Sequence, residues 1–189
     1  MDLLKIAPAV YLSSETDPAA IRCMRYGWPG TTEVGDVRTL HVEQIQRLLE
    51  DYPNLRILLI VGGSPCKGLS SSNRAGQGLA NKHSKLFFDF VRIIEECQAV
   101  LNLQVEFIFE NVASTKPHDR QIMSQLLGCQ PVFVCGSLVS HCRRPRLFWV
   151  SFWNYVAWPW EITEKGAFWH LEIPGGPGPV SRWKKPGVS

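Results

Sequence analysis

A loop at the end of a strongly apolar segment presents the residue best suited to nucleophilic chemistry. The run Leu55–Val61 ends in Gly62-Gly63-Ser64-Pro65-Cys66. Glycines permit a sharp turn, and Pro65 fixes the approach of the chain to Cys66. A cysteine held on such a loop is exposed, and its thiolate is a strong nucleophile. Taken alone, the segment is equally consistent with a buried cysteine that happens to follow a turn.

A carboxylate and two guanidinium groups occur at comparable places further along the chain. Glu110 follows the expected buried strand at 105–109. A carboxyl group that is partly desolvated there would have a raised pKa, which suits it to hold or donate a proton. A helix cap made by Glu110 or Asn111 is the structural alternative. Arg144 and Arg146 stand at alternate positions on entering a later strand, and alternate residues share one face. Both guanidinium groups are therefore expected to address one anionic or carbonyl-rich ligand, unless they form an exposed basic edge.

The elements that must position these residues alternate between strands and helices. This alternation predicts parallel βαβ units in an α/β fold, whose ligand sites lie beyond the carboxyl ends of the strands. Asp17 is expected to cap a helix that begins at Pro18. The nearly continuous apolar run over 55–61 is typical of a central strand buried on both faces. Strands are expected at 10–12, 55–61, 105–109, 131–134 and 147–152, and further helices at 41–51, 86–94 and 122–127. Glu15, Asp36, Cys66 and Glu110 all fall at expected strand ends.

Composition is that of one ordinary globular domain. The chain has 189 residues, 45% of them hydrophobic and 20% charged, and a net charge of +3. No apolar run approaches the roughly 20 residues that span a bilayer, and no signal peptide opens the chain, so a membrane or secreted protein is not expected. The six cysteines include no Cys-x-x-Cys pair. They are read as reduced thiols, and no metal site is predicted.

Taken in order, these segments resemble the cytosine-5 DNA methyltransferases. Gly63–Cys66 resembles the Pro-Cys nucleophile loop of that family, Glu110–Val112 its Glu-Asn-Val strand end, and Arg144–Arg146 its Arg-x-Arg element. Gly35–Arg38 and Leu86–Phe90 look especially like the animal de novo branch. The resemblance spans roughly residues 10–152. It implies a Rossmann-like methyltransferase fold dependent on S-adenosylmethionine, with a mostly parallel sheet.

The resemblance also implies a reaction: transfer of a methyl group from S-adenosylmethionine to carbon 5 of a cytosine in DNA. Cys66 would attack carbon 6, Glu110 would engage N3 and the amino group, and Arg146 with Arg144 would orient the base. The cytosine would be flipped out of the duplex, and Ser70–Asn81 would form the mobile catalytic loop. For the cofactor, the resemblance places Glu15 on the ribose hydroxyls and Asp36 on the adenine amino group, with Val37, Pro65 and Leu86 lining the pocket.

The sequence departs from the family pattern at both ends. The first strand, its glycine-rich cofactor loop and the target-recognition region have no counterpart here, so residues 1–152 are read as a partial catalytic domain. Residues 153–189 form a tail rich in Trp, Gly and Pro that is expected to be poorly ordered. Three readings stay open: an enzyme whose activity depends on a protein partner that supplies the missing elements, a catalytically impaired DNA-binding or regulatory subunit, and an RNA cytosine-5 methyltransferase. A nuclear location is expected in a eukaryote and a cytoplasmic one otherwise.

Overall fold

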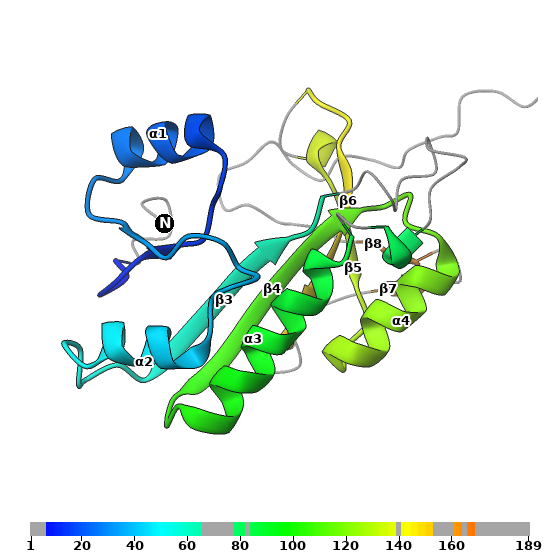
Figure 1. Ribbon diagram of the computed structural model, residues 1–189. Helices are drawn as coiled ribbons and strands as arrows, with labels where there is room; N and C mark the ends of the chain where they lie inside the picture. Colours follow the sequence, from blue (N-terminus) through cyan, green and yellow to red (C-terminus); the bar gives the residue numbers. More distant parts are fainter. Residues whose placement is uncertain are drawn as a thin grey trace, which may run out of the picture.

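The computed structural model describes residues 7–65, 78–81, 84–138, 141–152, 161–163 and 166–168, and Figure 1 shows their arrangement. The helices are α1 (Pro18–Gly27), α2 (Val42–Leu49), α3 (Leu86–Val100) and α4 (Pro117–Leu127), with short 3-10 turns at Gly78–Ala80 and Gly136–Leu138. The strands are β1 (Leu12–Ser13), β2 (Thr32–Glu33), β3 (Ile57–Gly63), β4 (Gln104–Val112), β5 (Val132–Cys135), β6 (Pro145–Val150), β7 (Glu161–Thr163) and β8 (Gly166–Phe168). The α/β class is confirmed.

The amino-terminal part of the chain forms a small unit of its own. β1 and β2 pair in parallel as a separate two-stranded sheet, and α1 connects them. The predicted start of α1 is confirmed, because the Asp17 side chain accepts the N–H of Ala19 (2.7 Å) and Pro18 opens the helix. Because the two strands are parallel, their carboxyl ends lie at the same edge of this small sheet.

The main sheet has four strands in the order β3-β4-β6-β5. β3 and β4 are parallel, whereas β6 is antiparallel to both β4 and β5. The sheet is therefore mixed, and the prediction of a mostly parallel sheet is wrong. The reason is the connection between β5 and β6, which spans only residues 136–144. A parallel crossover needs a dozen or more residues, so a connection of this length returns the chain antiparallel.

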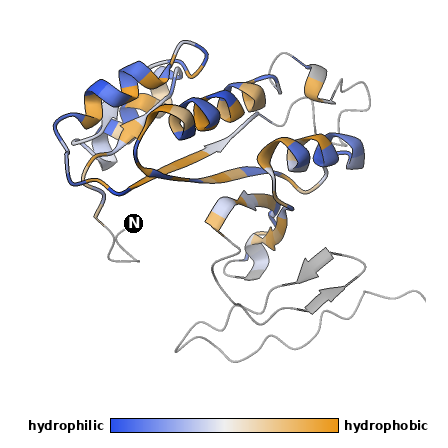
Figure 2. Ribbon diagram, turned by 90° about the horizontal axis from the view of Figure 1, so that it is seen from below, coloured by the Kyte–Doolittle hydropathy of each residue, from blue (hydrophilic) through white to orange (hydrophobic). Residues whose placement is uncertain are grey.

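β3 lies at the edge of this sheet, which corrects the prediction of a central strand buried on both faces. In the described residues it pairs only with β4. Leu58 and Ile60 pack into the core, while Ile57 and Val61 on the opposite face are 57% and 64% exposed. The apolar run correctly indicates a strand, and β3 is apolar up to its two final glycines (Figure 2). The apolar run alone does not show whether one or both faces of the strand are covered by the rest of the chain.

The main core lies between the sheet and helices α3 and α4, which cover one face (Figure 1). Phe87 of α3, Phe109 of β4 and Trp149 of β6 are almost fully buried. Their rings contact one another in edge-on and tilted arrangements, at 5.2 Å between the Phe87 and Phe109 centroids and 5.9 Å between Phe109 and Trp149. The Trp149 indole N–H donates to the Ser124 hydroxyl of α4 (2.9 Å). This core fixes β4, and hence the residues at its carboxyl end, relative to α3 and α4.

β7 and β8 are a short antiparallel pair within the tail. The remainder of residues 153–189 lies outside the described residues, and the expectation of poor order there stays a prediction. No helix in the described part of the chain is long and apolar enough to cross a membrane.

Candidate active site

The carboxyl ends of β3 and β4 lie side by side and are joined by a buried asparagine. Asn111 of β4 is 1% exposed. Its Nδ2 donates to the Ser64 hydroxyl (3.0 Å) and to the Ser64 carbonyl oxygen (3.3 Å), while its Oδ1 accepts the N–H of Val112 (2.8 Å). Ser64 directly precedes Pro65, which is exposed. Asn111 therefore holds the start of the loop that leads to Cys66. Cys66 itself lies outside the described residues.

Gly62 and Gly63 belong to β3 rather than to a turn, so the predicted sharp turn at these two glycines is wrong. The reason for glycine here is the close approach of other groups. A Cβ on Gly62 would lie 2.7 Å from ring atoms of Phe90, and a Cβ on Gly63 would lie 3.0 Å from Glu110 Oε2 and 3.1 Å from its carbonyl oxygen. The two glycines thus make room for the core and for the Glu110 carboxylate.

Glu110 forms an ion pair with Arg146 across the sheet. The Nε of Arg146 lies 2.5 Å from Oε1 of Glu110, with the side chains 20% and 37% exposed, respectively. β4 and β6 are antiparallel with Val112 opposite Arg146, so Glu110 is the diagonal neighbour of Arg146 on the same face. Oε1 is used by this pair, while Oε2 lies over Gly63. Glu110 is a strand residue paired with Gly63 of β3, and it is not a helix cap.

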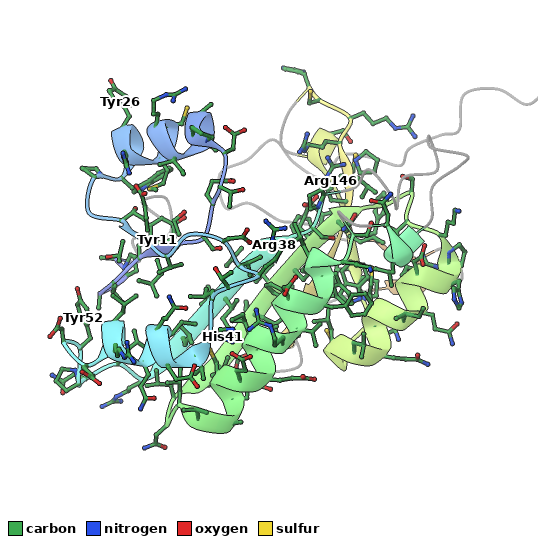
Figure 3. The ribbon with its side chains drawn as sticks, viewed as in Figure 1. Tyr11, Tyr26, Arg38, His41, Tyr52 and Arg146 are labelled. Carbon is green, nitrogen blue, oxygen red and sulfur yellow. The ribbon has the colours of Figure 1, made fainter. Side chains whose placement is uncertain are left out.

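Arg144 and Arg146 occupy different environments. Arg146 lies in β6, points toward the end of β4 (Figure 3), and also donates from Nη1 to the Pro145 carbonyl oxygen (2.9 Å). Arg144 precedes the strand and has an exposed side chain, and its carbonyl oxygen accepts the N–H of Gly136 (3.1 Å). The described contacts bring Arg146 to Glu110 and leave the side chain of Arg144 outside this pair.

Two further carboxylates stand at the ends of β1 and β2. The Ser14 hydroxyl donates to the Gly35 carbonyl oxygen (2.7 Å), and this bond ties the chain next to Glu15 to the chain next to Asp36. Gly35 has a φ of 78°, a backbone conformation that favours glycine. Glu15 accepts the N–H groups of Thr16 (2.7 Å) and Asp17 (2.9 Å) through Oε1. The predicted cofactor residues Glu15 and Asp36 are therefore held on adjacent strand ends.

Asp36 is held in its ionised form by Arg38. The Nε of Arg38 donates to both carboxylate oxygens (3.0 and 2.9 Å), Nη2 donates to Oδ2, and the Arg38 N–H donates to Oδ1 (2.9 Å). The hydrogen bonds from the Arg38 side chain and backbone lower the pKa of Asp36 to about 2. Asp36 is consequently a permanent hydrogen-bond acceptor at physiological pH.

Arg92 links α3 to the loop that carries Asp36 and Val37, a role that no sequence pattern indicated. It donates from Nη2 to the Val37 carbonyl oxygen and from Nη1 to the Leu40 carbonyl oxygen, each at 2.8 Å. Glu96 accepts from Arg92 (2.9 Å) and from the Val42 N–H (3.1 Å). Burial acts to raise the pKa of Glu96, but these hydrogen bonds outweigh it, and the pKa lies below its ordinary value. Leu86, a half-buried residue at the start of α3, belongs to the same anchored helix.

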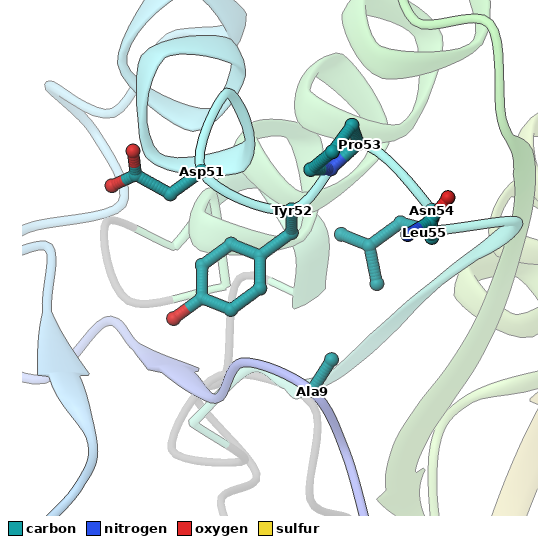
Figure 4. A pocket seen from close by; sticks show the side chains of 6 residues that line it. All are labelled: Ala9, Asp51, Tyr52, Pro53, Asn54 and Leu55. Atoms are coloured by element: carbon teal, nitrogen blue, oxygen red, sulfur yellow. The ribbon is translucent and has the colours of Figure 1, made fainter.

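An open hollow on the described surface lies away from all these residues. It has a volume of about 250 Å³ and opens near the amino end of β3 (Figure 4). It is lined by Ala9, Asp51, Tyr52, Pro53, Asn54 and Leu55. The described His, Cys, Asp and Glu side chains form no group of three or more that could hold a metal ion. The chemistry indicated by the sequence therefore belongs to the strand ends and not to this hollow.

Comparison with known proteins gives a consistent result. Residues 3–127 match the model of the C-5 cytosine-specific DNA methylase family. A DNA (cytosine-5)-methyltransferase of Arabidopsis thaliana, DRM1, is 37% identical over 99 residues, which are 49% of this chain and 16% of that protein. DRM2 of Oryza sativa subsp. japonica is 39% identical over 71 residues, 37% of this chain and 12% of that protein. The type II methyltransferase M.NgoBV of Neisseria gonorrhoeae is 28% identical over 123 residues, 65% of this chain and 26% of that protein. The chain thus corresponds to only a small part of each relative.

Proposed function

Because the chain belongs to the C-5 cytosine-specific DNA methylase family, we propose that it transfers a methyl group from S-adenosylmethionine to carbon 5 of cytosine in DNA. The observation that supports this most directly is the junction of β3 and β4. Gly63 and Glu110 are opposite one another, Asn111 binds Ser64, and Arg146 pairs with Glu110. Glu110 thus lies at the edge of the sheet from which the chain leaves β3 toward Cys66, the proposed nucleophile.

In the proposed reaction the Cys66 thiolate forms a bond to carbon 6 of the cytosine, and the electron pair of the C5–C6 double bond becomes available at carbon 5. When bound, S-adenosylmethionine would supply an electrophilic methyl group to carbon 5, its S–CH3 bond breaking so that the cofactor leaves as the neutral thioether. Loss of the carbon 5 proton to a base then returns an electron pair to the ring, and the bond between Cys66 sulfur and carbon 6 breaks. Thiolate and methylated cytosine are thereby regenerated.

Glu110 and Arg146 would hold the ring during this sequence. Oε1 of Glu110 is engaged by Arg146, whereas Oε2 lies over the end of β3, from which the Cys66 loop departs. We assign Oε2 to the N3 and amino edge of the base, where a carboxyl group stabilises the charge that develops on attack. Arg146 keeps the carboxyl group in orientation and contributes to binding the carbonyl of the base. Arg144, exposed just before β6, is assigned to the neighbouring DNA backbone.

The residues at the ends of β1 and β2 fit the adenosine part of S-adenosylmethionine. Glu15 uses only Oε1 for its backbone hydrogen bonds, so Oε2 is available to ribose hydroxyls. Asp36 stays ionised and accepts hydrogen bonds, as recognition of an amino group requires. Val37 is anchored through its carbonyl oxygen by Arg92 of α3, the helix that begins at Leu86. Val37, Leu86 and Pro65 are assigned to the walls of the cofactor pocket.

The DNA substrate would present a flipped cytosine, since a stacked base is out of reach of a cysteine on a protein loop. In a eukaryotic cell this substrate places the activity in the nucleus. A protein partner is further proposed to contribute to the cofactor site and to recognition of the DNA target.

Two measurements test this function. Titration calorimetry should show S-adenosylmethionine binding that Asp36→Ala weakens by at least tenfold, while Asp51→Ala, an exposed residue at the opposite end of β3, leaves it unchanged. Transfer of a labelled methyl group should appear in DNA and not in RNA of the same sequence. Binding equal in wild type and Asp36→Ala would contradict the cofactor assignment, and transfer to RNA alone would favour an RNA methyltransferase.

A further inference from the structure

A buried carboxylate in the first turn of α4 has no part in the reaction described above. Asp119 is 7% exposed, although aspartate is rarely buried in proteins. A buried carboxylate is costly unless hydrogen bonds satisfy it. Oδ1 of Asp119 accepts the backbone N–H of Leu79 (3.4 Å), a residue 40 positions earlier in the chain. The carboxylate also lies at the amino end of α4, where the helix dipole favours negative charge.

The short turn at Gly78–Ala80 is built around this carboxylate. Gly78 has a φ of +58°, and a Cβ placed on it would lie 2.7 Å from Oδ1 of Asp119 and closer still to Oδ2. Glycine is therefore required for two independent reasons, its backbone conformation and the closeness of the carboxylate. The next residue, Leu79, is 6% exposed and belongs to the main core. Asp119 thus fixes the backbone next to a residue that packs in the core.

The other end of the same segment is fixed from the same structural unit. Asn111, at the end of β4, binds Ser64. Residues 113–116 alone separate β4 from α4. This connection is tight, because the N–H and the hydroxyl of the buried Thr115 both donate to the Val112 carbonyl oxygen (3.1 and 2.7 Å). One rigid unit therefore binds the chain at residue 64 and again at residues 78 and 79.

We propose that Asp119 is a positioning residue that, together with Asn111, sets the separation and orientation of the two ends of the segment carrying Cys66. The role in catalysis rests on the function proposed above. Fixing Ser64, Gly78 and Leu79 on one unit limits the arrangements open to the chain between these residues. A displacement of about 1 Å at a reacting group costs up to roughly 100-fold in rate. Asp119 touches neither the base nor the cofactor, and acts through the backbone of Gly78 and Leu79.

The test compares Asp119→Ala and Asp119→Asn with His118→Ala, an exposed neighbour in the same turn of α4. Asparagine keeps an oxygen that can accept the Leu79 N–H, whereas alanine does not. Hydrogen–deuterium exchange of peptides covering residues 78–81 reports the clamp without any ligand. The rate of covalent adduct formation with DNA containing 5-fluorocytosine, measured at saturating DNA, reports its effect on Cys66.

Asp119→Ala is expected to speed exchange over 78–81 by at least tenfold while exchange in α3 stays unchanged, which also shows that the variant is folded. Adduct formation should slow by about 10- to 100-fold with DNA affinity changed less than twofold. Asp119→Asn and His118→Ala should stay within about threefold of wild type in both measurements. Unchanged exchange in Asp119→Ala would overturn the clamp, and faster exchange with an unchanged adduct rate would overturn its positioning role. A wild-type chain that forms no adduct would contradict the proposed function instead, and the exchange result would then decide the clamp alone.

Discussion

Replacing Asn111 with alanine removes the side chain by which β4 holds the end of β3. Three hydrogen bonds are lost: two to Ser64 and one from the Val112 N–H. Each contributes about 1 kcal/mol net when buried, so the free energy of unfolding should fall by about 3 kcal/mol. For a chain of this size, each kcal/mol shifts Tm by about 2–4 °C, which gives an expected decrease of roughly 6–12 °C.

Asn111→Asp separates the contact with Ser64 from the contact with Val112. Aspartate has the same shape and still accepts the Val112 N–H, but it places an acceptor against the Ser64 carbonyl oxygen. Its cost should be at least about 2 kcal/mol, because the contact with the Ser64 carbonyl oxygen is lost and a carboxylate is buried in place of a neutral amide. Asn102→Ala, in the exposed turn before β4, is the matched control and should change stability by less than about 0.5 kcal/mol.

Urea denaturation followed by circular dichroism provides the free energies, and scanning calorimetry provides Tm. A decrease for Asn111→Ala no larger than that for Asn102→Ala would refute the view that Asn111 holds the two strand ends together. Equal stability of Asn111→Asp and wild type would show that the donors to Ser64 contribute nothing.

Three further results are expected. Arg146→Ala should lower stability by about 1 kcal/mol, and a double-mutant cycle with Glu110→Gln should give a coupling of about 0.5–1 kcal/mol, whereas strict additivity would contradict the ion pair. Asp36 should titrate near pH 2 by NMR, and Arg38→Ala should move this titration upward toward the ordinary value of 3.8 without reaching it, because alanine keeps the backbone N–H that donates to Oδ1. Because the folded pKa of Asp36 is lowered, this interaction favours folding above about pH 3.8 and is lost as the pH falls toward 2. Burial, aided by the charge of Glu96, raises the pKa of Cys97 to about 11. Cys97 should therefore resist a thiol reagent at pH 8 in the folded chain and react in guanidinium chloride. Rapid labelling of the folded chain would contradict the buried position of Cys97.

The parts of the fold that local chemistry determines could be predicted from the sequence. Asp17 before Pro18 marks the start of α1 because both preferences act within one helical turn. The spacing of Val42 and Ile45 places α2 because both side chains face the same core. The apolar run of β3 indicates a strand for a similar reason, but its position at the sheet edge depends on pairing partners far along the chain.

The candidate site was predictable in composition but not in geometry. Glu110 and Arg146 could be chosen by residue type, while their pairing follows from the antiparallel register of β4 and β6, which no local pattern encodes. Gly62 and Gly63 suggested a turn, because a sequence shows flexibility at glycine and does not show a neighbour that needs the space. Asp119 carries no sequence signal at all, since its partner lies 40 residues away.

The central claim, methylation through a covalent cysteine adduct, is tested most directly by mass spectrometry of the chain after incubation with S-adenosylmethionine and a DNA duplex containing 5-fluorocytosine. Fluorine at carbon 5 cannot leave as a proton does, so the adduct accumulates. Wild type and Cys23→Ser, an exposed cysteine on α1, should gain the mass of the methylated oligonucleotide, and Cys66→Ser should not. A wild-type chain that stays unmodified, or an adduct that persists in Cys66→Ser, would contradict the account.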